Sequence, residues 1–249
     1  MVINKYSWIL ILTLLINSCT TVQHISKTDV KYTVVSSDSS INEDEEINTI
    51  IAPYKVQLDA VMNEELAVLP AELAKKKPES PLGNWVTDAI VDRLRKDNYP
   101  VDFAVVNYGG LRIPYLTAGS VTRGKVFELA PFDNTIMVVE VPGIKLDSFF
   151  LLVAEADGWP VSKEVKLVIS NKKLISAQIA GEPIDRNKTY KMATLDYVAT
   201  GGDDMKVLIP LLRKETGLIF RDVLIDHLKQ ATAAGIPVTA AMEGRIISQ

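Results

Sequence analysis

Apolar side chains recur along this chain with two different periods, one typical of helices and one typical of strands. Between residues 54 and 66, and again between 82 and 94, an apolar residue returns every three or four positions, which predicts two amphipathic helices. Ser80 and Pro81 suit the start of the second helix, because serine caps a helix N-terminus and proline is tolerated in the first turn. For the same reason we expect the first helix to start near Pro53.

Shorter apolar runs, bounded by turn residues, predict strands and further helices. Strands are expected at 101–106, 135–141, 165–169, 174–179, 190–195 and 245–247. Helices are expected at about 120–129, 145–155 and 218–233. Helices and strands do not alternate regularly, so the predicted fold class is α+β: one domain with a mixed β-sheet packed by helices.

The first 49 residues have a different character. Residues 1–18 hold Lys5 and an apolar core too short to span a bilayer, which is typical of a signal peptide. The chain's only cysteine, Cys19, follows Ile16-Asn17-Ser18 and resembles the lipobox of bacterial lipoproteins, which implies that Cys19 becomes lipidated after cleavage. An ordinary secretory peptide that contains a cysteine is the alternative.

A serine-rich and acidic segment follows, with few large apolar residues, so we expect a flexible tether. The predicted organisation is a lipoprotein signal peptide at 1–18, a lipidated Cys19 with its tether at 19–49, and one folded domain at 50–249. The protein would be exported and anchored by lipid to a bacterial membrane, in the periplasm or on the outer membrane. A net charge of -4 and a pI near 5.3 give no electrostatic footprint for nucleic acid, so none is expected as a partner.

Candidate chemistry gathers where the apolar run 101–106 ends. Gly109 and Gly110 allow the backbone to turn and to approach a ligand closely, and Asn107 and Arg112 flank them. An amide and a guanidinium supply directed hydrogen bonds, so a small-molecule site is one interpretation. A tight turn with a surface arginine is the other. The lysine run 75–77 is expected to be a solvated surface, with a place near an anionic ligand as the alternative.

Six motifs occur in order along the chain: Ser80-Pro81-Leu82-Gly83-Asn84 with Thr87-Asp88-Ala89, Asn107-Tyr108-Gly109-Gly110-Leu111-Arg112, Pro131-Phe132-Asp133-Asn134, Trp159-Pro160-Val161-Ser162, Asp196 to Asp203, and Glu243-Gly244-Arg245-Ile246. Together they resemble the C-terminal domain of the 5'-nucleotidases, a family that includes UDP-sugar hydrolases and cyclic-nucleotide phosphodiesterases. The resemblance covers about residue 50 to the end.

The resemblance implies that this domain holds the nucleoside part of a substrate. Phe132 and Tyr197 resemble the two rings that sandwich the base, and base stacking is worth ~1–3 kcal/mol. Asp203 resembles the acid that accepts hydrogen bonds from ribose, Asn107 the amide that contacts base or ribose, and Arg112 the cation on the phosphate side. Taken singly, the two rings are also compatible with core positions, and Asp203 with a turn.

The chain departs from the family in three respects. Asp204 and Met205 stand where relatives usually carry glycine and an aromatic residue, and residues 75–77 are lysines where relatives often supply an arginine toward the phosphate. The metal-binding motifs of the family's N-terminal metallophosphatase domain, of the Asp-x-His and Gly-Asn-His-Asp/Glu types, do not occur, and His24 and His227 cannot build a two-metal centre. We expect His227 to lie on a helix surface.

These observations lead to three hypotheses. The first is a nucleotide- or nucleoside-binding specificity subunit of a split 5'-nucleotidase, with divalent metals held by a separate metallophosphatase subunit. The second is a membrane-tethered lipoprotein that binds nucleosides or nucleotides without catalysis, and the third is a purely structural lipoprotein. No catalytic residue and no cofactor are expected in this chain, so alone it should not hydrolyse nucleotides.

Overall fold

The computed structural model describes residues 27–32 and 44–249, and these fall into two units, 1–48 and 49–249. The predicted signal peptide and Cys19 lie outside the described residues. Residues 27–32 have no regular secondary structure. Within the described ranges, no helix combines the length and apolar character needed to cross a membrane.

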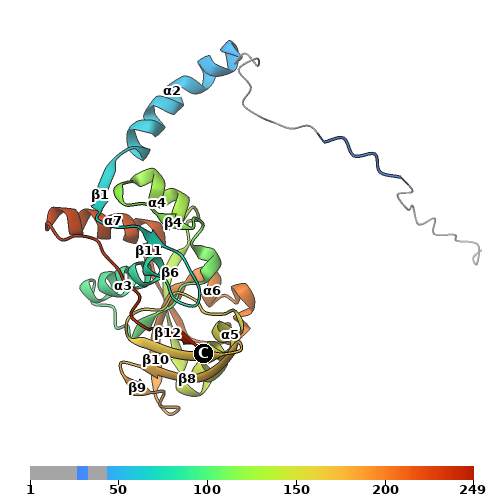
Figure 1. Cartoon of the computed structure of the whole chain (residues 1–249), viewed down its shortest axis with the longest axis vertical. Helices are drawn as coiled ribbons and strands as arrows, with labels where there is room; N and C mark the ends of the chain where they lie inside the picture. The colour runs from blue at the N-terminus through green and yellow to red at the C-terminus, as the bar shows by residue number, and fades with distance from the viewer. Residues whose placement is uncertain (1–26, 33–43) are drawn as a thin grey trace, which may run out of the picture. The chain divides into compact units, whose positions relative to one another are not determined.

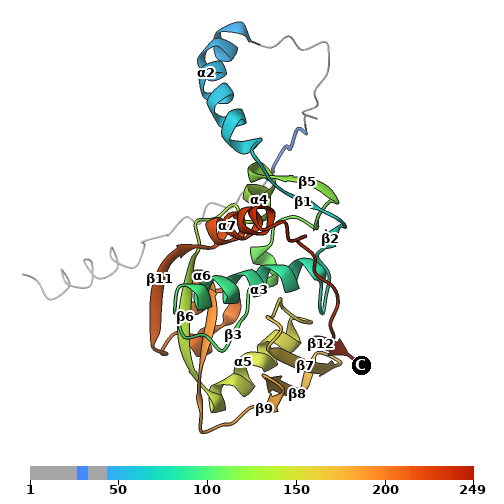
Figure 2. The same cartoon turned by 90° about the vertical axis from the view of Figure 1, so that its left-hand side faces the viewer.

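A four-stranded mixed sheet forms the centre of the 49–249 unit, with the strand order β11-β6-β10-β3 (Figures 1 and 2). β6 (Thr135–Pro142) pairs antiparallel with β10 (Thr189–Leu195) on one side and with β11 (Arg213–Ile219) on the other. β10 pairs in parallel with the short β3 (Phe103–Ala104). The predicted α+β class with a mixed sheet is confirmed.

The sheet has a hydrophobic core on each face, because successive side chains of a strand point to opposite faces. Ile136 and Val138 of β6 belong to one core, together with α3 (Pro81–Lys96) and α7 (Phe220–Ala233). Met137 and Val139 belong to the other, together with α5 (Gly143–Glu155). A strand buried on both faces is expected to be a nearly continuous apolar run, and Ile136 to Val139 of β6 form one.

A second four-stranded sheet packs on the α5 side, in the order β12-β7-β8-β9. Its strands are β7 (Val165–Ser170), β8 (Lys173–Ile179), β9 (Glu182–Pro183) and β12 (Ile246–Ser248). Two small two-stranded sheets complete the fold, formed by β1 (Glu65–Leu69) with β5 (Gly119–Thr122) and by β2 (Leu73–Ala74) with β4 (Tyr115–Leu116). α4 (Arg123–Leu129) and α6 (Asp196–Ala199) are short helices between strands.

The two predicted helix starts have different outcomes. The Ser80 hydroxyl accepts a hydrogen bond from the Gly83 amide at 3.1 Å, so the predicted cap of α3 is confirmed. α2 (Glu45–Met62) instead begins eight residues before Pro53, so the start predicted at Pro53 is wrong. The Asp44 carboxylate accepts hydrogen bonds from the amides of Glu46 and Ile47 at 3.0 and 3.2 Å and caps α2.

α2 contains no buried residue, although its sequence is rich in apolar side chains. Leu66 lies in β1 and not in this helix, so the helical pattern predicted to run to residue 66 ends at Met62. The tether predicted at 19–49 overlaps this helix, because residues 45–49 form the first turns of α2.

Candidate functional site

Three loops meet at one end of the central sheet, and the strand directions explain why. β3 and β10 run in parallel, so their carboxyl ends point the same way and the loops that follow them emerge together. β6 is antiparallel to β10, and Ile136 pairs with Leu195, so the loop that enters β6 lies beside the loop that leaves β10. Residues 107–112, 131–134 and 196–204 are brought together by this arrangement.

These loops enclose a cavity of about 360 Å³. All five residues predicted from the resemblance as ligand contacts line the cavity, namely Asn107, Arg112, Phe132, Tyr197 and Asp203. Gly109, Gly110 and Asn134 complete the lining. Asn134 is not among the predicted residues. Its position at the end of the Pro131–Asn134 motif, beside Phe132, is the sequence feature that could have indicated it. Whether the cavity binds a ligand stays a prediction.

The two rings of the cavity are unusually accessible for large apolar side chains. Phe132 is 51% exposed and Tyr197 is 47% exposed, so neither is a core residue. The Arg112 guanidinium carbon lies 5.7 Å from the centre of the Phe132 ring, and its Nη1 donates to the Gly109 carbonyl at 3.3 Å. Arg112 is thus placed at the rim of the cavity, held by a long hydrogen bond to its own loop.

Asp203 is held by two neighbours that also line the cavity. Its Oδ2 accepts a hydrogen bond from Asn107 Nδ2 at 2.7 Å, and its Oδ1 accepts one from the Tyr197 hydroxyl at 3.0 Å. Asp203 has a φ of 50°, a left-handed conformation that aspartate tolerates better than most residues. Gly202 must lack a side chain, because a Cβ there would lie 2.5 Å from the Tyr197 ring.

Asn107 is only 5% exposed, and its Oδ1 is buried without a hydrogen-bond partner among the described residues. A buried acceptor that stays unpaired costs roughly 1–3 kcal/mol. Gly110 leaves room for this oxygen, because a Cβ at that position would lie 2.7 Å away. Asn107 thus holds a buried acceptor behind Gly110, and one of its two amide N–H donors is used by Asp203.

The lysine run beside the cavity is not uniformly solvated. Lys75 is partly buried, and its ammonium donates to the Leu111 carbonyl at 2.6 Å and lies 4.1 Å from the centre of the Tyr108 ring. Burial lowers the pKa of Lys75, and the positive charges of Arg112 and Lys77 lower it further. The prediction of a solvated run is wrong for Lys75, whereas Lys76 and Lys77 are exposed.

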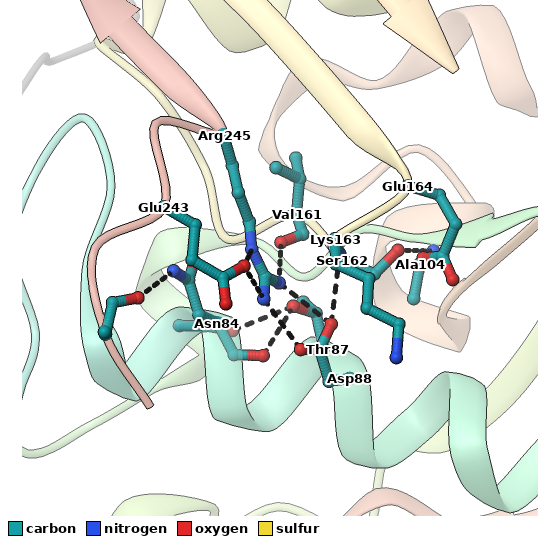
Figure 3. Close-up of polar contacts among 12 residues, drawn as sticks. Asn84, Thr87, Asp88, Ala104, Val161, Ser162, Lys163, Glu164, Glu243 and Arg245 are labelled. Carbon is teal, nitrogen blue, oxygen red and sulfur yellow. Dashed lines mark hydrogen bonds and ion pairs between the residues drawn. The ribbon is translucent and has the colours of Figure 1, made fainter. Parts of the chain in front are cut away.

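The other three motifs meet elsewhere, in a polar network around Arg245 (Figure 3). Arg245 is 2% exposed and forms two hydrogen bonds to the Asp88 carboxylate, at 2.8 and 2.7 Å. It also donates to Glu243 at 3.0 and 2.8 Å and to the Val161 carbonyl at 3.0 Å. Burial opposes the charge of Arg245, but the hydrogen bonds and charges of Asp88 and Glu243 outweigh it and raise the pKa of the guanidinium.

Glu79 extends this network at the start of α3. Its carboxylate accepts hydrogen bonds from Asn84 Nδ2 at 2.7 Å and from the amides of Glu243 and Arg245 at 2.7 and 2.9 Å. The network ties the C-terminal strand β12 to α3 and to the loop at Val161 (Figure 3). Because the donors and acceptors of its buried side chains find partners within the chain, the network serves the fold and offers little to a ligand.

The described part of the chain does not provide a metal centre. Across residues 27–32 and 44–249, no group of three or more His, Cys, Asp or Glu side chains is arranged to hold a metal ion. We expected His227 on a helix surface, but its side chain in α7 is partly buried and accepts a hydrogen bond at Nδ1 from Trp85 Nε1 at 3.2 Å. Burial lowers the pKa of His227, against the opposing effect of the charges of Asp92 and Asp88. The described residues therefore do not fit a two-metal centre.

The geometry defines an α+β domain with an open cavity lined by aromatic and polar side chains at the loop end of a mixed sheet. The model of the family described as "5'-nucleotidase, C-terminal domain" matches residues 61–209, which is more than half of the chain. The chain belongs to this family.

Relatives agree with this assignment. Protein UshA of Escherichia coli strain K12 is 28% identical over 212 residues, which cover 80% of this chain and 37% of UshA. Cell wall protein Lmo0130 of Listeria monocytogenes is 25% identical in an alignment that covers 91% of this chain and 32% of that protein. The chain thus spans about a third of the length of these relatives.

A solved structure shows the same fold. The crystal structure of a 5'-nucleotidase precursor from Thermus thermophilus matches with a TM-score of 0.70 and 24% sequence identity, covering 83% of this chain and 43% of that one.

Proposed function

We propose that this domain binds a nucleoside or nucleotide in the cavity at the loop end of the central sheet. The base stacks between Phe132 and Tyr197, and the ribose hydroxyls donate to Asp203. Arg112 pairs with phosphate, for which a guanidinium offers two parallel hydrogen bonds. The observation that carries the proposal is that residues from three separate loops, each predicted as a ligand contact, line one cavity whose two rings are about half exposed.

We further propose that the domain is the specificity subunit of a split 5'-nucleotidase, with divalent metals on a separate metallophosphatase subunit. A substrate shared between two chains needs an open binding face. The exposure of the Phe132 and Tyr197 rings supports such a face on this domain. α2 offers a second apolar surface to such a partner, because Ile50, Tyr54 and Leu58 are 60%, 74% and 55% exposed. No catalytic step is assigned to residues of this chain.

Export with a lipid anchor at Cys19 is part of the same proposal. One relative carries the name "cell wall protein", which supports a location outside the cytoplasm. Labelling of cells with a radioactive fatty acid would attach label to the wild type and not to Cys19→Ala. Label on neither would overturn the anchor.

The binding proposal is tested by calorimetric titration of the purified domain with adenosine and with AMP. Saturable heat below millimolar ligand is expected, and its absence for both ligands would overturn the proposal. Co-purification with a metallophosphatase chain, followed by a nucleotidase assay, then separates the two functions. Metal-dependent hydrolysis by the pair supports the split enzyme, whereas binding without any partner or turnover supports a tethered receptor.

A further inference from the structure

The ring proposed to stack on the base and the acid proposed to hold the ribose are joined by a hydrogen bond. The Tyr197 hydroxyl lies 3.0 Å from Asp203 Oδ1 and donates to it. We propose that this hydroxyl is a positioning group, which orients the Asp203 carboxylate and so makes the site select ligands that carry a sugar diol as well as a base. The inference rests on the proposed function of the cavity.

The two oxygens of Asp203 are each fixed by one donor. Tyr197 holds Oδ1 and Asn107 Nδ2 holds Oδ2 at 2.7 Å, so two donors on different loops determine the plane of the carboxylate. An ionised carboxylate has about four lone-pair sites, so about two acceptor sites remain after these hydrogen bonds. Because Asp203 lines the cavity, the remaining sites suit two adjacent hydroxyl groups of one ligand.

The backbone around Asp203 explains why the carboxylate needs such support. Gly201, Asp203 and Asp204 have φ values of 99°, 50° and 61°, so the loop follows a left-handed path in place of a regular helix. Backbone hydrogen bonds from Gly201 to the Val198 carbonyl and from Met205 to the Gly202 carbonyl, at 3.0 and 3.1 Å, hold the loop on either side of Asp203. They do not involve the Asp203 side chain, whose direction is set by its contacts with Tyr197 and Asn107.

The ring and the loop also restrain one another directly. Gly202 passes so close to the Tyr197 ring that a Cβ would lie 2.5 Å from it. Movement of the ring thus disturbs the loop that carries Asp203, and movement of the carboxylate breaks the hydrogen bond to the ring. A ligand that orders the ring by stacking is expected to order the acid too, which couples base recognition to ribose recognition.

Tyr197→Phe separates the two roles of the side chain, because phenylalanine keeps the stacking ring and removes only the hydroxyl. The experiment titrates wild type and variant with adenosine and with 2',3'-dideoxyadenosine, which has the same base and lacks both hydroxyls of the sugar diol. We expect the dissociation constant for adenosine to rise about five- to tenfold, as for the net loss of one ordinary hydrogen bond, because the hydroxyl acts on the ligand only through the carboxylate. The value for dideoxyadenosine is expected to stay within about twofold.

Tyr115→Phe is the matched control. Tyr115 has the same exposure as Tyr197, 47%, but does not line the cavity, so removal of its hydroxyl should affect neither ligand. A double variant with Asp203→Ala provides the second control. If the hydroxyl acts through the carboxylate, Tyr197→Phe will add no further loss once Asp203 is truncated.

Each other result has a definite meaning. Equal losses for both ligands, or no loss for either, would overturn the positioning role while leaving nucleoside binding intact. If wild type binds neither ligand, the proposed function fails, and the hydrogen bond is then judged in the ligand-free protein. There the ¹³C resonance of Tyr197 Cζ should move in Asp203→Ala; an unmoved resonance would overturn the positioning role by itself.

Discussion

The cavity and the Arg245 network contain similar polar residue types, but these are paired within the chain to very different extents. In the network, the guanidinium of Arg245 is buried and contacts Asp88, Glu243 and a backbone carbonyl. In the cavity, Arg112 donates a 3.3 Å hydrogen bond to a carbonyl, and Asn107 keeps a buried oxygen unpaired among the residues that the structure describes. Polar groups that are satisfied within the chain stabilise the fold, whereas an exposed guanidinium with one long hydrogen bond, such as Arg112 at the open cavity, remains available to a ligand.

The comparison predicts that substitutions in the network change stability, and that substitutions in the cavity change binding. Removing one partner of a buried ion pair leaves the other charge without compensation. Removing a half-exposed side chain leaves no such defect, because water replaces it.

The largest effect is expected for Arg245→Ala. It removes a buried guanidinium from the partly exposed Asp88 and Glu243 carboxylates and should lower the free energy of unfolding by ~3 kcal/mol, the lower end of the range for a buried pair, measured by urea denaturation. Arg186→Ala is the matched control, because it removes an exposed arginine paired with Asp147 and should cost less than about 1 kcal/mol. Similar losses for both arginines would show that burial does not separate them.

A smaller effect, confined to binding, is expected for Arg112→Ala, and it should depend on phosphate. AMP is expected to lose about tenfold or more in affinity, in line with one charge-assisted contact worth ~1.5–3 kcal/mol, while adenosine changes little. Equal losses for AMP and adenosine would show that Arg112 does not face phosphate.

Phe132→Ala should have the next effect in size. Loss of one stacking face should weaken the binding free energy of adenosine by ~1–3 kcal/mol, measured by calorimetric titration. The ring is half exposed, so the urea midpoint should stay close to that of the wild type. Marked destabilisation with unchanged affinity would place Phe132 with the folding residues and contradict the division.

Much of the fold could be predicted because its elements have local causes. α3 follows from the Ser80 cap and its apolar stripe, and β6 follows from an apolar run. β11 could not be predicted, because its residues Arg213 to Ile219 are largely polar and exposed. A strand at the sheet edge is fixed by backbone pairing with β6, and a sequence pattern does not record that pairing.

The candidate site shows the same limit. The resemblance supplied the five residues that share the cavity, because motifs survive as short sequence strings. It could not divide the six motifs between binding and folding, because burial depends on contacts between distant segments, such as Asp88 with Arg245. The resemblance also could not predict the Tyr197–Asp203 hydrogen bond, because this bond depends on the path of the loop between the two residues.

The smallest expected effect is on the pH dependence of stability, through His227, which contacts Trp85 of α3. Burial lowers the pKa of His227 below its usual 6.5, so the unfolded chain binds a proton at a higher pH than the folded protein. Stability from neutral His227 is therefore full above about pH 6.5 and declines as the pH falls through the lowered folded pKa. In His227→Gln, which can still accept the Trp85 hydrogen bond, the loss of unfolding free energy between about pH 7 and 5 should be smaller than in the wild type. Parallel pH profiles would mean that water reaches His227 as freely in the folded state as in the unfolded one, and Trp85 would then not shield it.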